Sequence, residues 1–149
     1  MNAERIQRIF AVNVTGSFLC AREAVKRMST KYGGKGGSIV NLSSGAAKYG
    51  SPWEYVDSTA SKAAIDTLTI GLAKEVAEEG IRVNAVRPGF IDTEIHQSGG
   101  EPDRMERVRL LVPIKRVGQA EEVADAIMWL LSDKASYTTG TILDVSGGR

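Results

Sequence analysis

Residues 38–64 read SIVNLSSGAAKYGSPWEYVDSTASKAA, and this stretch decides the fold. Its β-prone run, Ile39–Leu42, predicts a central parallel strand that is buried on both faces and stops at a serine pair. A loop with glycine and proline follows, and a helical pattern then carries Lys62. Ligands of open parallel α/β sheets bind just beyond the carboxyl ends of the strands, so Ser44 is expected at such a site.

The predicted helix places Ser58 and Lys62 on one face, because residues four apart are neighbours on a helix surface. Apolar residues continue at helical spacing over residues 64–76, and Gly80 stands where a left-handed residue usually ends a helix. A second buried strand, IRVNAVRPGF at residues 81–90, follows and ends at a Pro-Gly turn. Helix, strand and turn in this order are typical of a right-handed crossover unit.

The segment before the first strand is predicted to be helical. Helical spacing over residues 6–28 indicates two helices, or one long helix that is disturbed near residues 13–16. The glycine-rich residues 31–37 lead into a strand, whereas a phosphate loop must lead into a helix N-terminus. A flexible connector is therefore predicted there.

The C-terminal part completes an α/β pattern. Residues 91–117 are irregular and could form a lid over a site or pack on the surface. A helix is predicted at residues 121–131 and a strand at 141–145. With no internal repeat or linker, residues 1–149 are predicted to be a single domain. The fold class is three-layer α/β: a partial doubly wound (Rossmann-like) parallel sheet of about three strands with flanking helices.

Composition limits the partners of this chain. Its 149 residues are 42% hydrophobic and 25% charged, which is typical of a globular chain with a real core. The 19 basic residues interleave with acidic ones to a net charge of +1, so no nucleic-acid or membrane partner is expected. No apolar run approaches the roughly 20 residues of a membrane-spanning helix.

Location and metal binding can also be predicted. The N-terminal MNAERIQRIF is too charged for a secretory signal, so a cytoplasmic location is expected. One cysteine allows no internal disulfide, and Cys20 is expected to be a small buried thiol. His96 is the single histidine of the chain, and no cluster of metal ligands accompanies it, so no metal site is predicted.

Several short motifs follow one another along the chain. They are VNVTG around Asn13, IVNLSS, TASKAA, RVNAVRPGFIDT, EEVADAIMWLLSD and TGTILDVSGG. In order and spacing, and over nearly all 149 residues, they resemble the C-terminal half of the short-chain dehydrogenase/reductases. The resemblance implies a doubly wound sheet and hydride transfer between NAD or NADP and a small carbonyl or alcohol substrate.

The resemblance also implies roles for single residues. Asn13 would sit at a helix distortion and hold a water in a proton relay. Ser44 would hydrogen-bond the substrate oxygen, while Lys62 would bind the nicotinamide ribose and lower the pKa of a neighbouring acid. The residues that would line the nicotinamide and its phosphates are Pro88, Gly89, Ile91 and Thr93. Helices around Phe18–Met28 and Thr59–Val76 would form a four-helix contact, which implies a homo-oligomer.

Two features depart from the family pattern. The catalytic tyrosine that precedes the lysine by four residues is replaced by Ser58. A serine hydroxyl is a much weaker acid than a phenol, so most of the roughly 10²–10⁴-fold effect of positioned proton transfer would be lost. Tyr55 could bring in a phenol after a register adjustment. The chain also lacks the glycine-rich dinucleotide loop and is not expected to bind a whole dinucleotide tightly, or to use a cofactor on its own.

Three functions therefore remain open. The first is an oxidoreductase whose activity needs the missing half. The second is an esterase-like serine hydrolase, in which Ser44 or Ser58 attacks an ester and neutral Lys62 is the base. The third is a non-catalytic oligomerising module, since an uncovered sheet edge and apolar face invite pairing with another chain. Ser58 could equally be a helix cap.

Overall fold

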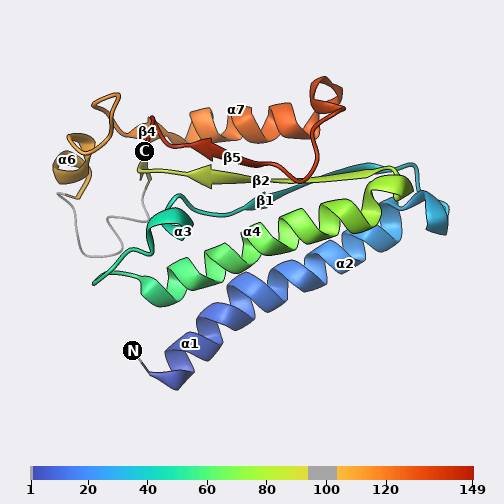
Figure 1. Ribbon diagram of the computed structural model, residues 1–149, viewed down its shortest axis with the longest axis horizontal. Coiled ribbons are helices and arrows are strands. Elements are labelled where there is room, and N and C mark those ends of the chain that lie inside the picture. The colour runs from blue at the N-terminus through green and yellow to red at the C-terminus, as the bar shows by residue number, and fades with distance from the viewer. Residues whose placement is uncertain (1, 94–103) are drawn as a thin grey trace.

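Three parallel strands form the central sheet of the computed structural model, which describes residues 2–93 and 104–149 (Figure 1). They are β1 (Gly37–Leu42), β2 (Ile81–Pro88) and β5 (Ile142–Val145), in the order β1-β2-β5. Gly37 lies opposite Ile81, and Ala85 opposite Ile142. The α/β class and the three predicted strands are confirmed. A second parallel pair, β3 (Ile91–Asp92) with β4 (Gly118–Gln119), was not predicted.

Helices cover both faces of this sheet, so the three-layer prediction is confirmed (Figure 1). The long α4 (Val56–Val76) and α2 (Gly16–Met28) lie on one face, and α7 (Ala120–Leu131) lies on the other. The remaining helical segments are α1 (Ala3–Phe10), η1 (Ala11–Thr15), η2 (Thr30–Tyr32), α3 (Ala46–Tyr49), η3 (Ala77–Glu79), α6 (Arg104–Arg109) and η4 (Asp133–Ala135). None of the described helices is long and apolar enough to cross a bilayer.

Strand β2 supplies the core on both faces, because successive side chains of a strand point to opposite sides. Ile81 and Val83 are buried among residues of α4 and α2, while Val86 packs against residues of α7. The polar Asn41 of β1, for which a partner was expected, donates a 2.8 Å hydrogen bond to the Thr69 hydroxyl.

The N-terminal helices form one continuous rod with a π-helical turn, Ala11–Thr15, between α1 and α2. This confirms the prediction of one long helix disturbed near residue 13. Gly80, at φ 76°, follows the helical segment after α4, as predicted. The connector 31–37 leads into a strand, but close backbone packing explains its glycines. A Cβ on Gly34 would lie 2.3 Å from the Met28 carbonyl oxygen, and one on Gly36 would lie 2.4 Å from that of Gly80.

Two expectations from the sequence are wrong, and a third concerns residues that the structure does not describe. β1 is the outer strand of the described sheet, and Leu42 is 52% exposed, so the central strand buried on both faces is β2 rather than β1. Cys20 is exposed, because the helix α2 turns it away from the sheet. His96 and the middle of the predicted lid, residues 94–103, lie outside the described residues.

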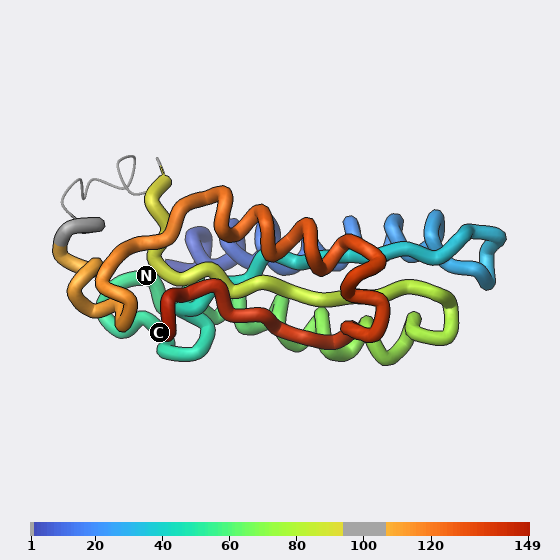
Figure 2. The backbone as a smooth tube through the Cα atoms, turned by 90° about the horizontal axis from the view of Figure 1, so that it is seen from above, coloured from blue at the N-terminus to red at the C-terminus, as the bar shows by residue number. Residues whose placement is uncertain are grey.

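The carboxyl ends of the strands gather at one end of the molecule. The short helices α3 and α6 and both chain ends lie there as well (Figure 1). The perpendicular view in Figure 2 shows the same grouping around the C-terminus. Segments far apart in the sequence therefore meet where the ligand site was expected.

Candidate functional site

Backbone hydrogen bonds align the ends of β1 and β2. The Ser43 N–H donates to the Val86 carbonyl and the Gly45 N–H to the Pro88 carbonyl, both at 2.9 Å. Gly89 allows the next strand to approach, because a Cβ there would lie 2.8 Å from Ser146 Cα. Ser44 is thereby held beside the Pro88–Gly89 turn, as the sequence predicted.

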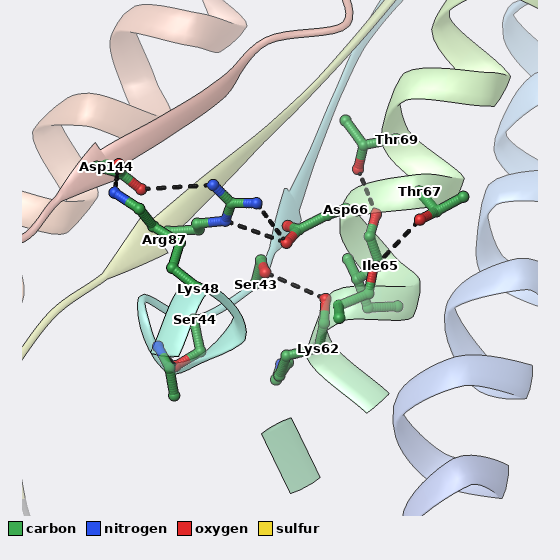
Figure 3. A network of polar contacts seen from close by, with 12 residues as sticks. Ser43, Ser44, Lys48, Lys62, Ile65, Asp66, Thr67, Thr69, Arg87 and Asp144 are labelled. Carbon is green, nitrogen blue, oxygen red and sulfur yellow. Dashed lines mark hydrogen bonds and ion pairs between the residues drawn. The ribbon is translucent and has the colours of Figure 1, made fainter. Parts of the chain in front are cut away.

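The two serines at the end of β1, Ser43 and Ser44, have different surroundings. Ser43 is buried, and its hydroxyl donates to the Lys62 backbone carbonyl at 3.2 Å, which ties the end of β1 to α4 (Figure 3). The half-buried Ser44 Oγ accepts a 3.2 Å hydrogen bond from the Ala46 N–H. Its hydroxyl proton therefore remains available to a ligand oxygen.

Lys62 reaches from α4 to the outer strand. Its Nζ donates to the Leu42 carbonyl at 2.8 Å. That carbonyl points away from β2, because the next residue, Ser43, is the one whose N–H faces β2. Burial lowers the pKa of Lys62, and the nearby carboxylate of Asp66 opposes this shift.

A line of alternating charges lies beside Lys62 (Figure 3). Asp66 Oδ2 accepts hydrogen bonds of 2.7 and 3.1 Å from Arg87, while its Oδ1 is buried with no hydrogen-bond partner. Arg87 also lies 3.8 Å from Asp144, which pairs with Lys48 at 2.7 Å. Because Asp66 and Lys62 are one helical turn apart, this network fixes the part of α4 that carries the lysine.

A cavity of about 840 Å³ opens at this end of the sheet. Six of the predicted site residues line it together: Ser44, Tyr55, Ser58, Lys62, Pro88 and Gly89. The further lining residues are Gly45, Ala46, Tyr49, Ser51, Pro52, Glu54, Thr59, Phe90, Arg107, Val108, Leu111, Ser146 and Arg149. Its volume falls within the ordinary range for small-molecule sites.

Ser58 lies in the first turn of α4 and is not its cap. The cap position is Tyr55, without a capping hydrogen bond from its side chain, and the Ser58 N–H donates to the Asp57 carboxylate at 2.8 Å. The Arg5 guanidinium and then this amide hold the pKa of Asp57 below its usual range. Ser58 and Tyr55 both line the cavity. The hydrogen bonds described for Ser44, Ser58 and Lys62 join neither hydroxyl to Nζ.

Asn13 lies in the π-helical turn, where the resemblance implied a helix distortion. Its side-chain amide donates to Ser61 Oγ at 2.9 Å, and Ser61 in turn donates to the Ser58 carbonyl at 2.6 Å. The Ser17 hydroxyl donates a 2.7 Å hydrogen bond to the Asn13 carbonyl. Asn13 is thus connected to the start of α4 but is not part of the cavity lining.

The other two residues predicted to contact a nicotinamide lie outside the cavity lining. Ile91 belongs to β3 and packs against the core between the sheet and α7. Thr93 is at the end of the described segment that follows β3. Their predicted roles remain predictions.

The fold is part of a doubly wound α/β architecture, with a cavity at the strand ends. Residues 1–149 match the family described as Enoyl-(Acyl carrier protein) reductase. The chain is 66% identical over its whole length to the uncharacterized oxidoreductase YgfF of Escherichia coli (strain K12). The chain belongs to the short-chain dehydrogenase/reductase family.

Other relatives agree on the family. The chain is 41% identical over 146 residues to a glucose and ribitol dehydrogenase homolog of Oryza sativa, which covers 96% of this chain. It is 40% identical over 148 residues to glucose 1-dehydrogenase 2 of Bacillus subtilis, which covers 99%. The chain spans 60% of YgfF, 48% of the rice protein and 56% of the Bacillus protein.

Sequence reasoning missed the aromatic and basic part of the lining. Tyr49, Phe90, Arg107 and Arg149 come from four separate segments, and no local spacing connects them. It also missed Asp66, although its position one turn after Lys62 was a usable signal.

Proposed function

We propose that this chain is the substrate-binding part of an NAD(P)-dependent oxidoreductase that acts on a small carbonyl or alcohol. The observation that carries the proposal is the shared cavity, which Ser44, Lys62, Pro88 and Gly89 line together. The family membership and the names of the relatives support the same reaction class.

The side chains fit the division of roles that the family pattern implies. The Ser44 hydroxyl donates a hydrogen bond to the substrate oxygen and so orients the carbonyl. Lys62 has three donors, and its bond to the Leu42 carbonyl occupies one of them, so two can reach ligand hydroxyls. Its partly buried ammonium also favours the anionic form of an acid beside it.

The residues present fit the nicotinamide end of the cofactor. NAD(P)H supplies a hydride to the carbonyl carbon when it is bound. Pro88 and Gly89 offer a backbone edge beside Lys62, whose donors suit ribose hydroxyls. The chain contains no glycine-rich loop for the pyrophosphate, and its relatives are longer. We therefore assign the rest of the dinucleotide to the additional part of such longer proteins.

Ser58 makes this site a poor proton donor. It lines the cavity at the position where the family has its tyrosine, and a serine hydroxyl does not ionise near neutral pH. We propose that reduction is slow for this reason, and that Tyr55, which is 41% exposed and seven residues from Lys62, does not replace the acid.

The test joins the N-terminal segment of YgfF to residue 1 of this chain and follows NADH and NADPH oxidation with a panel of carbonyl compounds. Ser58→Tyr should raise kcat by about 10²–10⁴-fold. Tyr55→Phe should change little, and Lys62→Ala should abolish the gain. A joined protein that stays inactive after Ser58→Tyr, while it is folded and binds NADPH, would refute the proposal.

We also propose a homo-oligomer through the helices α2 and α4. Their outer surfaces carry exposed apolar side chains, including Phe18, Leu19 and Ile70. Leu19→Glu should shift sedimentation from an oligomer to the monomer, whereas Tyr137→Glu, at a fully exposed site beyond these helices, should not. A wild-type chain that sediments as a monomer would contradict this contact.

A further inference from the structure

The cavity contains basic side chains that the proposed reaction does not use. Among the described lining residues, Lys62, Arg107 and Arg149 have cationic side chains and Glu54 has the one anionic side chain. Glu54 and Arg107 each have an interaction partner, and Lys62 donates to a carbonyl. Arg149 is therefore the basic residue whose charge needs an explanation.

Arg149 is held in place by aromatic rings and by a backbone turn. Its guanidinium lies 4.5 Å from the centre of the Phe90 ring and 5.3 Å from that of Tyr49. The Ser146 hydroxyl donates to the Arg149 carbonyl at 2.8 Å. These cation–π contacts do not pair the N–H donors of the guanidinium with an acceptor oxygen. No side-chain carboxylate of the described residues forms an ion pair with this guanidinium.

Apolar side chains share the wall with these charges. Val108 and Leu111 line the cavity together with Phe90, and Ser44 lies at the strand-end side. A ligand that contacts both Ser44 and Arg149 needs a polar oxygen and an anionic group, with carbon atoms between them. Arginine binds carboxylates through two parallel hydrogen bonds, which gives both charge and orientation.

We propose that the substrate is an organic anion, a small oxo acid or the corresponding hydroxy acid, whose carboxylate is bound by Arg149. This inference rests on the proposed function, because it takes the carbonyl beside Ser44 from that reaction. Arg149 is a specificity-determining residue in this scheme and takes no part in proton or hydride transfer.

The test measures equilibrium binding to the chain itself by ¹H–¹⁵N NMR titration. The probes are 4-oxopentanoate and its methyl ester, which share a ketone and differ in charge. The acid should bind roughly tenfold more tightly than the ester. Arg149→Gln should remove this preference without weakening the ester, and Arg149→Lys should retain part of it. Arg27→Gln, which removes an exposed charge from α2, is the matched control and should change neither affinity.

Equal binding of acid and ester, no binding of either, or a preference that survives Arg149→Gln would overturn the inference. A preference lost equally in Arg27→Gln would also overturn it, since net charge would then explain the effect. The readout is independent of turnover. An inactive joined enzyme together with an intact acid preference would therefore remove the redox proposal and leave the anion site standing.

Discussion

The buried pair of Asp66 and Arg87 should be worth far more to stability than the exposed ion pairs of this chain. The Asp66 side chain is 10% exposed and that of Arg87 is 20% exposed, and both hydrogen bonds end on Asp66 Oδ2. Removal of one member of such a pair leaves an uncompensated charge in a poorly solvated place.

The two single substitutions should differ in size. Arg87→Ala strands a carboxylate that already has one unpartnered oxygen, and this should cost about 3–5 kcal/mol of unfolding free energy. Asp66→Ala leaves Arg87 with Asp144 at 3.8 Å, so a smaller loss of about 2 kcal/mol is expected. Replacement of both by apolar residues, Asp66→Leu with Arg87→Met, should cost less than the sum of the two.

Urea unfolding followed by circular dichroism measures these changes through the midpoint and the slope. The matched control is Glu23→Ala, which removes the shared partner of three exposed basic residues on α2 and should change stability by less than about 1 kcal/mol. If Arg87→Ala and Asp66→Ala both fall within the range of this control, the network is not a buried electrostatic support for α4.

Three further predictions concern the chain alone. Gly36→Ala should destabilise the fold by more than about 1 kcal/mol, because Gly36 has a φ of 79° and the Gly80 carbonyl lies close to it. Gly71→Ala, at an open position of a helix, should stabilise the fold by about 0.5–1 kcal/mol. The midpoints of urea unfolding measure both changes. The Arg116 guanidinium and the Gln119 N–H lower the pKa of Glu122 to about 2, so Arg116→Gln should raise it toward 4.5 in an NMR titration. In the wild-type chain, the stabilisation that Glu122 contributes is complete above pH 4.5 and is lost as the pH falls toward 2. An unchanged pKa of Glu122 in the Arg116→Gln variant would contradict the ion pair between these residues. In the Leu19→Glu variant, which is expected to be monomeric, Cys20 should react with a thiol reagent in the folded chain as fast as in urea, and protection there would contradict its exposure.

Local pattern was sufficient for most of the fold. Short apolar runs ended by serine or Pro-Gly correspond to β1 and β2, and the helical spacing after Lys62 corresponds to α4. These elements follow from side-chain periodicity, which the sequence displays directly. The burial of β1 was overestimated because a run of apolar residues looks alike in a central and an outer strand, and only the pairing order distinguishes them.

The site was predictable only where it coincides with strand ends. Ser44 and Pro88 could be placed there because parallel strands share one carboxyl edge. The stacking of Arg149 on Phe90 and Tyr49 could not, since the three residues are separated by 41 positions or more in the sequence, and tertiary packing alone brings them together. Ser58 was expected to be a possible cap, but α4 begins three residues earlier than a cap at Ser58 would require.

The contact of Lys62 with Leu42 bears on which chemistry this cavity supports. A Ser–Lys hydrolase needs a neutral amine whose lone pair faces a serine hydroxyl. Here Nζ is directed as a donor to a strand carbonyl, and the Asp66 carboxylate one turn away opposes the effect of burial on its pKa. Both features stabilise an ammonium, which can orient hydroxyl ligands and favour an anionic neighbour. A lysine that donates here suits the dehydrogenase pattern, and the hydrogen bonds described for Ser44 and Lys62 do not join the serine hydroxyl to Nζ.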